Sequence, residues 1–460
     1  YLKGSTMLQS FNPFTGNLIE SYPEHSDREV EIIIENQSSR FKNWKKTDLN
    51  DRSKIIAQLG KILQKEQNNL ARLITSEMGK PITESLAEVA KCAWLCEFYA
   101  ENGAAMLQNN TIKTEAYSSY ISFEPIGIIF AIMPWNFPLW QALRFAVPTI
   151  LAGNVVLLKH APNVSGTSLK LESIFQEAGF PENVFRSILI QADRSEYIIK
   201  HKSIRGVTIT GSAKAGSSVA SLSGKYLKKC VLELGGSDPF IVFEDADFPG
   251  CCQAAVDSRM MNSGQVCIAA KRFIVHESIF QEFVEAQKNA LTSLNLGDPM
   301  QTKTQIGPMA RPDLASQLQK QIDDSIALGA KLICGGKASK SHPSIFEPTL
   351  LVDIQKDMPV YKEETFGPLA IVIPFKTEEE AILIANDTDF GLGASIWTQD
   401  LNKAKRVIKA IDAGAVFVNS LTKSDPRLPF GGIKNSGIGR ELSFYGITEF
   451  TNIKTNWIKA

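Results

Sequence analysis

The sequence predicts an α/β fold with two doubly wound sheets, because short apolar runs alternate with amphipathic segments in two separate blocks. The first block spans residues 125–235, and the second begins near Pro239. Ahead of both, the first hundred residues repeat apolar side chains at three- and four-residue spacing, which is typical of helices. A chain of 460 residues is long enough for about two to four domains. Two facing α/β blocks predict an active cleft between them.

The individual elements follow from periodicity and from glycine and proline punctuation. A turn is expected at 12–16, and helices are expected at 27–44, 49–64, 82–106, 165–178, 213–221, 279–294 and 312–328. Strands are expected at 127–133, 155–159, 207–210, 240–243, 272–276, 371–375, 395–397 and 415–419. Residues 111–124 and 446–457 are also strand-like. A strand at the end of the sequence needs a partner, either 111–124 or another subunit.

Composition and charge argue against a protein that binds nucleic acid or spans a membrane. Lysine plus arginine equals aspartate plus glutamate, 49 each, so charge predicts no nucleic acid and no anionic membrane as partner. The most apolar stretch, 126–158, is interrupted by prolines, asparagines and Arg144, which argues against a membrane span. The N-terminus lacks the pattern of a signal peptide, and we expect residues 1–6 to precede a native start at Met7.

The seven cysteines form no even framework, no CxxC pair and no spacing typical of metal ligands. We therefore expect no metal site. Most of these thiols are interpreted as small buried side chains in a reducing cytosol, which predicts a cytoplasmic protein.

One cysteine stands apart because it follows a glycine turn, in Gly264-Gln265-Val266-Cys267. A cysteine in an exposed loop or at a helix start meets backbone N–H groups that favour the thiolate. Cys267 is therefore a candidate nucleophile; the alternative is a buried, inert thiol.

Two further polar residues stand in apolar or rigid surroundings. Glu233 lies between Leu232 and Leu234, ahead of two glycines, and desolvation there would raise its pKa toward the range of a general base. The alternative is a surface glutamate at a strand end. Asn136 lies in a loop stiffened by two prolines and two aromatics, where its amide could donate to a developing oxyanion. The alternative is an asparagine that only forms a turn.

A phosphate site is predicted where the strand at 207–210 turns at Gly211 and Ser212 into a helix. The N–H groups at a helix N-terminus bind phosphate. The segment is neither GxGxxG nor a P-loop, so it does not identify the ligand by itself.

Taken together, the order of these motifs resembles the aldehyde dehydrogenase superfamily. The resemblance runs from Asn12-Pro13 to the segments 429–432 and 436–441, and it includes the segment 363–368. Glu233 and Cys267 stand at the family's spacing. The resemblance implies a Rossmann-type dinucleotide-binding domain (7–108 and 125–235), an α/β catalytic domain (236–440) and a small β oligomerisation element (109–124 and 441–460). That element implies a homodimer or a homotetramer.

The resemblance also implies a mechanism and a cofactor, NAD or NADP. Cys267 attacks the aldehyde carbon, and Asn136 with the Cys267 backbone N–H holds the oxygen. After hydride transfer to the nicotinamide, Glu233 activates the water that hydrolyses the thioester. The residues implied in cofactor binding are Trp135, Lys159, Gly211, Ser212, Leu234, Glu364 and Phe366.

Within the family, Gly235–Val242 and the run after Lys159 are similar to the branch that oxidises succinate semialdehyde. The resemblance implies that Arg144 binds the substrate carboxylate, which arginine suits best, and that Ser424 contacts the substrate. The alternative for Arg144 is a structural ion pair, and the alternative substrate is another short aliphatic aldehyde. A second arginine of that branch is Met261 here, and the cysteine of a redox switch is Ala269.

Pro162 stands where many NAD-preferring members carry a glutamate that binds the adenosine ribose. Without that carboxylate, a 2′-phosphate is not repelled, so we expect NADP to be accepted.

Three alternative functions fit the residues less well. A coenzyme-A-acylating dehydrogenase needs no water-activating base, so Glu233 argues against it. A Cys/His hydrolase lacks a histidine in a suitable context, since there are only five histidines. A binding protein on a retired enzyme fold would not be expected to retain Cys267, Glu233 and Asn136.

Overall fold

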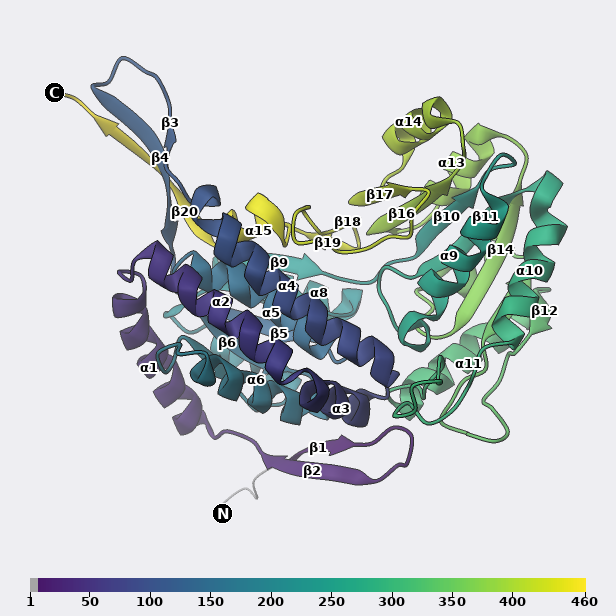
Figure 1. Ribbon diagram of the computed structural model, residues 1–460, viewed down its shortest axis with the longest axis horizontal. Coiled ribbons are helices and arrows are strands. Elements are labelled where there is room, and N and C mark those ends of the chain that lie inside the picture. The colour runs from purple at the N-terminus through teal and green to yellow at the C-terminus, as the bar shows by residue number, and fades with distance from the viewer. Residues whose placement is uncertain (1–6) are drawn as a thin grey trace.

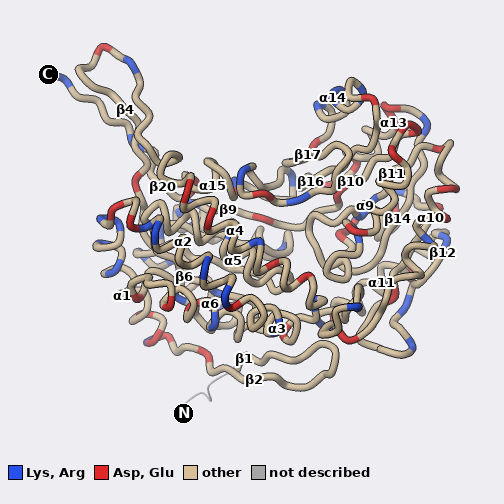
Figure 2. The backbone as a smooth tube through the Cα atoms, in the orientation of Figure 1, with Lys and Arg blue, Asp and Glu red and all other residues tan. Residues whose placement is uncertain are grey.

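The computed structural model describes residues 7–460 as two α/β bodies and a narrow antiparallel arm (Figure 1). The expectation about residues 1–6 lies outside the described residues. Basic and acidic residues are interspersed along the backbone of both bodies (Figure 2). None of the helices in residues 7–460 combines the length and the apolarity needed to cross a membrane.

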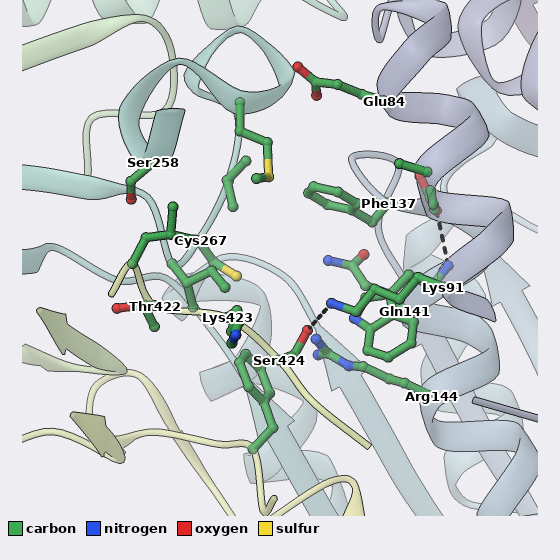
Figure 3. A pocket seen from close by; sticks show the side chains of 18 residues that line it. Glu84, Lys91, Phe137, Gln141, Arg144, Ser258, Cys267, Thr422, Lys423 and Ser424 are labelled. Carbon is green, nitrogen blue, oxygen red and sulfur yellow. Dashed lines mark hydrogen bonds between the residues drawn. The ribbon is translucent and has the colours of Figure 1, made fainter. Parts of the chain in front are cut away.

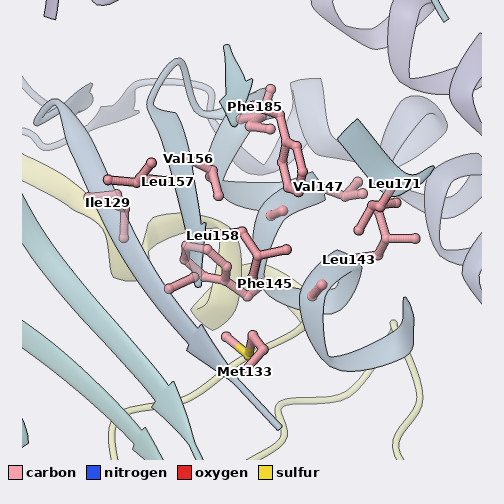
Figure 4. Close-up of a cluster of buried hydrophobic side chains, with 14 of the residues drawn as sticks. Ile129, Met133, Leu143, Phe145, Val147, Val156, Leu157, Leu158, Leu171 and Phe185 are labelled. Atoms are coloured by element: carbon pink, nitrogen blue, oxygen red, sulfur yellow. The ribbon is translucent and has the colours of Figure 1, made fainter. Parts of the chain in front are cut away.

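The first body is built on a six-stranded sheet of order β19-β9-β8-β5-β6-β7. Its strands are β5 (Ile128–Met133), β6 (Val155–His160), β7 (Phe185–Ser187), β8 (Ile204–Thr210), β9 (Lys229–Glu233) and β19 (Gly437–Ile438). All pairs are parallel except β19 with β9. Because a parallel sheet is covered on both faces, its strands are almost continuously apolar, as β6 illustrates. Side chains such as Leu143, Val147 and Leu171 pack against this sheet (Figure 4).

The helices of the first body cover the sheet in Figure 1. They are α1 (Asp27–Trp44), α2 (Leu49–Lys65), α3 (Gln67–Met78), α4 (Ile82–Met106), α5 (Pro138–Leu151), α6 (Ser165–Glu177), α7 (Ser195–Ile199) and α8 (Ala213–Lys225). A capping box formed by Ser26 and Glu29 begins α1. Every residue of α5 is buried, so the polar side chains on it must find partners inside the protein.

The second body has a seven-stranded sheet of order β12-β13-β14-β11-β10-β16-β17, parallel except for β12 with β13. The strands are β10 (Asp238–Val242), β11 (Ala270–His276), β12 (Lys331–Cys334), β13 (Thr349–Val352), β14 (Leu369–Phe375), β16 (Gly393–Trp397) and β17 (Ala415–Val418). The helices are α9 (Phe248–Met260), α10 (Phe280–Thr292), α11 (Pro312–Ala327), α12 (Pro359–Lys362), α13 (Glu378–Asn386) and α14 (Leu401–Ala410). The expected α/β fold is therefore present.

Smaller elements complete the chain. The turn at 12–16 joins β1 (Met7–Phe11) to β2 (Leu18–Pro23) in a hairpin, and β15 (Phe390–Gly391) pairs with β18 (Ile433–Lys434). The arm consists of β20 (Thr451–Ile458), β4 (Ser118–Pro125) and β3 (Asn110–Thr111), in that order. Of the two partners expected for the terminal strand, the structure shows β4 of the same chain, from Thr451 opposite Pro125 to Ile458 opposite Ser118.

The expected bounds of the last strand are wrong at its start, while several other elements extend a few residues beyond the expected ranges, such as α8 and β8. The strand expected from residue 446 begins only at Thr451, because 443–449 form the helix α15 (Ser443–Glu449). Gly446 permits this helix, since a Cβ there would lie 2.7 Å from the Glu441 carbonyl carbon. In addition, β19 lies inside the range expected for the catalytic domain but extends the first sheet, where a side chain on Gly437 would collide with the Leu232 carbonyl.

Candidate active site

Two cavities meet at the boundary between the bodies, and the residues that line both are Gln141 and Cys267. The larger cavity has a volume of about 640 Å³ and lies beside the N-terminus of α8. The smaller cavity has a volume of about 220 Å³ and runs between α4, α5 and the loop at 421–424. Cys267 is thus the point where molecules in the two cavities would meet.

A strained backbone positions the Cys267 loop. After α9, a 3₁₀ turn (Met261–Gly264) places Asn262 and Ser263 at φ of 51° and 53°, in the left-handed region that non-glycine residues rarely adopt. Gly264 follows at φ 75°, and any side chain there would collide with the Gly367 backbone. A glycine is therefore required at position 264, because the turn packs closely against the loop that precedes β14.

Two buried cations hold this loop in place. Arg259 donates to the carbonyls of Gly264 (3.1 Å) and Thr365 (2.9 Å), and also to those of Gly367 and Leu369. Lys271 donates to the carbonyls of Val266 (3.0 Å) and Cys267 (2.7 Å). Sequence reasoning did not assign a function to either residue; a charged side chain in an apolar segment was the available signal.

The Cys267 thiol does not have the environment expected for it. It lies in a turn before β11 rather than in an exposed loop or at a helix start, and solvent reaches it through the cavities. Burial raises the pKa of Cys267 to about 11, although Arg144 and Lys271 act in the opposite direction. Without a ligand, the thiol is therefore almost entirely protonated at neutral pH.

Asn136 lines the larger cavity and is fixed to the cysteine loop. Its Nδ2 donates to the Gln265 carbonyl at 3.0 Å, and its own carbonyl accepts from Asn262 Nδ2 at 3.1 Å. An amide nitrogen has two hydrogens, so one N–H remains for an oxygen near Cys267.

Glu233 is fully buried at the end of β9, and both carboxylate oxygens lack a hydrogen-bond partner within residues 7–460. Desolvation, reinforced by Glu441, raises its pKa well above the ordinary value, so the carboxyl must lose its proton before it can act as a base. Its Oε1 is directed toward Gly431, and Glu233 is absent from the linings of both cavities. The carboxylate must therefore rotate to reach a substrate on Cys267.

Arg144 lines the smaller cavity, but it also forms a buried ion pair with Glu441. Its Nη2 lies 3.4 Å from Thr210 Oγ1, and its guanidinium lies 4.7 Å from the centre of the Phe430 ring. The ion pair was the alternative interpretation of Arg144, and it coexists here with a position beside the cavity.

Ser424 lines the same cavity, where its hydroxyl accepts a hydrogen bond of 2.8 Å from Lys91 Nζ (Figure 3). Lys91 and Arg144 project from α4 and α5 and face Cys267 across the cavity (Figure 3). Sequence reasoning missed Lys91. The available signal was a lysine between apolar residues of α4, followed by the buried Cys92.

The larger cavity gathers six of the seven residues predicted for the cofactor: Trp135, Gly211, Ser212, Leu234, Glu364 and Phe366. The seventh, Lys159, is buried near the end of β6, outside that lining. Among the described residues, Lys159 Nζ donates to its neighbour's carbonyl alone, at 3.4 Å, and burial lowers its pKa to about 8. Ser212 caps α8, whose first-turn N–H groups adjoin the cavity.

These features fit a dinucleotide. A helix N-terminus suits the pyrophosphate, and a buried lysine without a carboxylate partner suits a ribose or its phosphate. Glu364 pairs with Lys271 at 3.4 Å and accepts from the Gly236 N–H at 3.1 Å, so its position is defined without a ligand. For metals, residues 7–460 bring together no group of three histidine, cysteine, aspartate or glutamate side chains suited to an ion.

The two α/β sheets and the two cavities that meet at Cys267 are those of a dinucleotide-dependent dehydrogenase. The sequence profile of the aldehyde dehydrogenase family matches residues 1–456, and the chain belongs to this family.

Individual relatives are similar over nearly their whole length. A probable succinate-semialdehyde dehydrogenase [NADP(+)] of Synechocystis sp. is 45% identical, over 98% of this chain and 99% of the relative. The succinate semialdehyde dehydrogenase [NAD(P)+] of Escherichia coli is 44% identical over 97% of each chain. Among solved structures, succinic semialdehyde dehydrogenase from Streptococcus pyogenes in complex with NADP+ superposes with a TM-score of 0.96 and 35% identity. The match covers 98% of this chain and all of that one.

Proposed function

We propose that the protein oxidises succinate semialdehyde to succinate with NADP or NAD. The observation that carries the proposal is the small cavity, whose lining includes Arg144, Ser424 and Cys267. A cavity of about 220 Å³ suits a four-carbon chain, and an arginine suits a carboxylate at its far end. The relatives in Synechocystis and Escherichia coli carry the same activity in their names.

The geometry gives each side chain a part in the reaction. The Cys267 thiolate adds to the aldehyde carbon and forms a thiohemiacetal, whose oxygen accepts from the free Asn136 N–H. A nicotinamide held in the larger cavity, which Trp135, Glu364 and Phe366 line, would supply the acceptor for the hydride that leaves the former aldehyde carbon, and Cys267 would then carry a thioester. Glu233, once ionised, rotates toward Cys267 and takes a proton from water. The hydroxide adds to the thioester carbon, the carbon–sulfur bond breaks, and succinate and the Cys267 thiolate are released.

Arg144 has an electrostatic part as well. Its charge lowers the pKa of both Cys267 and Glu233, so it favours the charged form of each group. The ion pair with Glu441 keeps this charge in place. The cationic nicotinamide of the oxidised cofactor would add to the same effect.

We also propose that NADP is accepted because Lys159 has no carboxylate partner within residues 7–460 and because Pro162 supplies none.

A homodimer or homotetramer is proposed from β20, which forms one edge of the arm and exposes Ile453 and Trp457. All seven cysteines are free thiols, which favours a reducing, cytoplasmic setting.

The test is a matrix of initial rates. Succinate semialdehyde, butanal (neutral and of the same length) and benzaldehyde are each supplied with NAD and with NADP. We expect kcat/KM for succinate semialdehyde to exceed that for butanal by about 100-fold, the effect of a charge-assisted contact worth about 3 kcal/mol. Equal or better rates with butanal would overturn the substrate but leave the chemistry at Cys267, and failure with NADP would overturn the cofactor proposal.

A second candidate function is oxidation of another short aliphatic aldehyde. It is favoured by the apolar walls of the small cavity, which include Phe137, Trp140 and Phe430. The same matrix distinguishes the two substrates.

A further inference from the structure

The charge on Lys91 is not used by the reaction described above. Lys91 is the only lysine of α4 (Ile82–Met106), and it lines the small cavity. Its Nζ donates to Ser424 Oγ at 2.8 Å and lies 4.1 Å from the centre of the Trp140 ring. An aromatic face and a hydroxyl hold the ammonium group in one place without neutralising it.

The two carboxylates that act electrostatically on Lys91, Glu88 and Asp425, already have partners. Glu88, one turn earlier on α4, forms a buried ion pair with Lys80 and accepts from the backbone N–H groups of Leu139 and Trp140. Asp425, next to Ser424, pairs with Arg427 at 2.6 Å. Lys91 itself has no ion pair within residues 7–460. Burial lowers its pKa to about 8, as expected for a cation that lacks a counter-ion.

The other cations of the cavity differ from Lys91 in this respect. Arg144 is paired with Glu441, so part of its charge is neutralised before a substrate arrives. Lys423 is exposed, and water therefore solvates its charge. Met261, also on the cavity wall, contributes no charge. The buried positive charge that is left to attract an anion belongs to Lys91.

We propose that Lys91, acting with the Ser424 hydroxyl, binds the distal carboxylate of the aldehyde and is the main determinant of specificity for linear aldehydes that end in a carboxylate. The inference rests on the proposed function and names Lys91 as the residue that recognises its substrate. The Ser424 hydroxyl accepts from Lys91 Nζ, so its own hydrogen is free to be donated to a carboxylate oxygen. Both groups then contact the same anion, and Arg144, whose charge is partly neutralised by Glu441, contributes less to its binding than Lys91.

The test compares Lys91→Met, Lys91→Arg and Lys61→Met, with succinate semialdehyde and butanal as substrates. Lys61→Met removes a charge from the exposed face of the neighbouring helix α2 and serves as the matched control. In Lys91→Met we expect KM for succinate semialdehyde to rise about 10- to 100-fold, the effect of losing a charge-assisted hydrogen bond. The kcat should change far less, and kcat/KM for butanal should fall far less. Lys91→Arg should restore most of the preference, since it keeps the charge.

A binding measurement separates recognition from a merely structural role. Succinate, the product, should inhibit Lys91→Met about 10- to 100-fold more weakly than wild type, in parallel with KM. Ser424→Ala, which keeps Lys91, should show a smaller loss in the same direction and serves if Lys91→Met does not fold. A preference for succinate semialdehyde that survives in both variants would overturn the inference. If wild type itself does not prefer succinate semialdehyde to butanal, the proposed function fails instead, whatever Lys91 does.

Discussion

The protonation of Cys267 gives the sharpest prediction, and the perturbation is pH alone. With a pKa of about 11, about one Cys267 in a thousand is a thiolate at pH 8 when no ligand is bound. For an ordinary thiol with a pKa of about 8.5, the fraction is about one in four. The fraction at Cys267 should therefore rise about tenfold for each pH unit between 7 and 9.5, without a plateau.

The rate of alkylation by iodoacetamide, followed at each cysteine by peptide mass spectrometry, measures this fraction. A more basic thiolate is intrinsically more nucleophilic, which offsets about tenfold of the difference. We therefore expect Cys267 to react about 20-fold more slowly than an ordinary thiol at pH 8. Cys252 is an internal comparison, because a hydrogen bond from Cys251 lowers its pKa, so its rate should level off at lower pH. A plateau for Cys267 by pH 8.5 would refute the conclusion that burial dominates its environment.

Three further predictions concern stability, cofactor and assembly. Arg259→Met removes the hydrogen bonds that Arg259 donates to four carbonyls and should lower the free energy of unfolding by about 4 kcal/mol. A urea midpoint no lower than that of the exposed-site control Arg72→Met, expected within about 0.5 kcal/mol of wild type, would contradict this. Pro162→Glu places a carboxylate near the adenosine ribose and should lower the ratio of kcat/KM for NADP to that for NAD by about tenfold; an unchanged ratio would mean that Pro162 lies away from the 2′-phosphate. Removing residues 451–460 deletes β20 and should reduce the assembly to monomers in analytical ultracentrifugation; a retained dimer or tetramer would exclude the arm as the main contact.

Candidate site residues could be singled out from the sequence where their immediate neighbours in the chain are distinctive. Cys267, Asn136 and the turn at Gly211 were found because a glycine, a proline or a strand end stands next to each of them. Elements with strong periodicity, such as α1 and α4, were predicted with the bounds that the structure shows. Short elements such as β1 and β19 were missed, since two to five residues carry too little periodicity.

Charge compensation could not be predicted in the same way, because it depends on contacts between distant parts of the chain. The ion pair of Arg144 with Glu441 joins residues 297 positions apart, and the hydrogen bond from Lys91 to Ser424 spans 333 positions. A sequence shows that a residue is charged but not whether folding places a counter-ion beside it. The raised pKa of Cys267 was missed for the same reason, since it depends on how much protein surrounds the thiol.

Glu441 has a consequence for how changes near the end of this sequence are interpreted. It stands two residues before α15, which leads directly into the arm, and its carboxylate balances Arg144, which lines the small cavity together with Cys267. A substitution or fused tag that displaces α15 would therefore alter the charge at the reacting centre without touching a catalytic residue. In a screen of variants, such changes would lower activity and be classified with active-site mutations, although they lie in α15, outside the linings of both cavities. Affinity tags are for this reason better placed ahead of β1 than after β20.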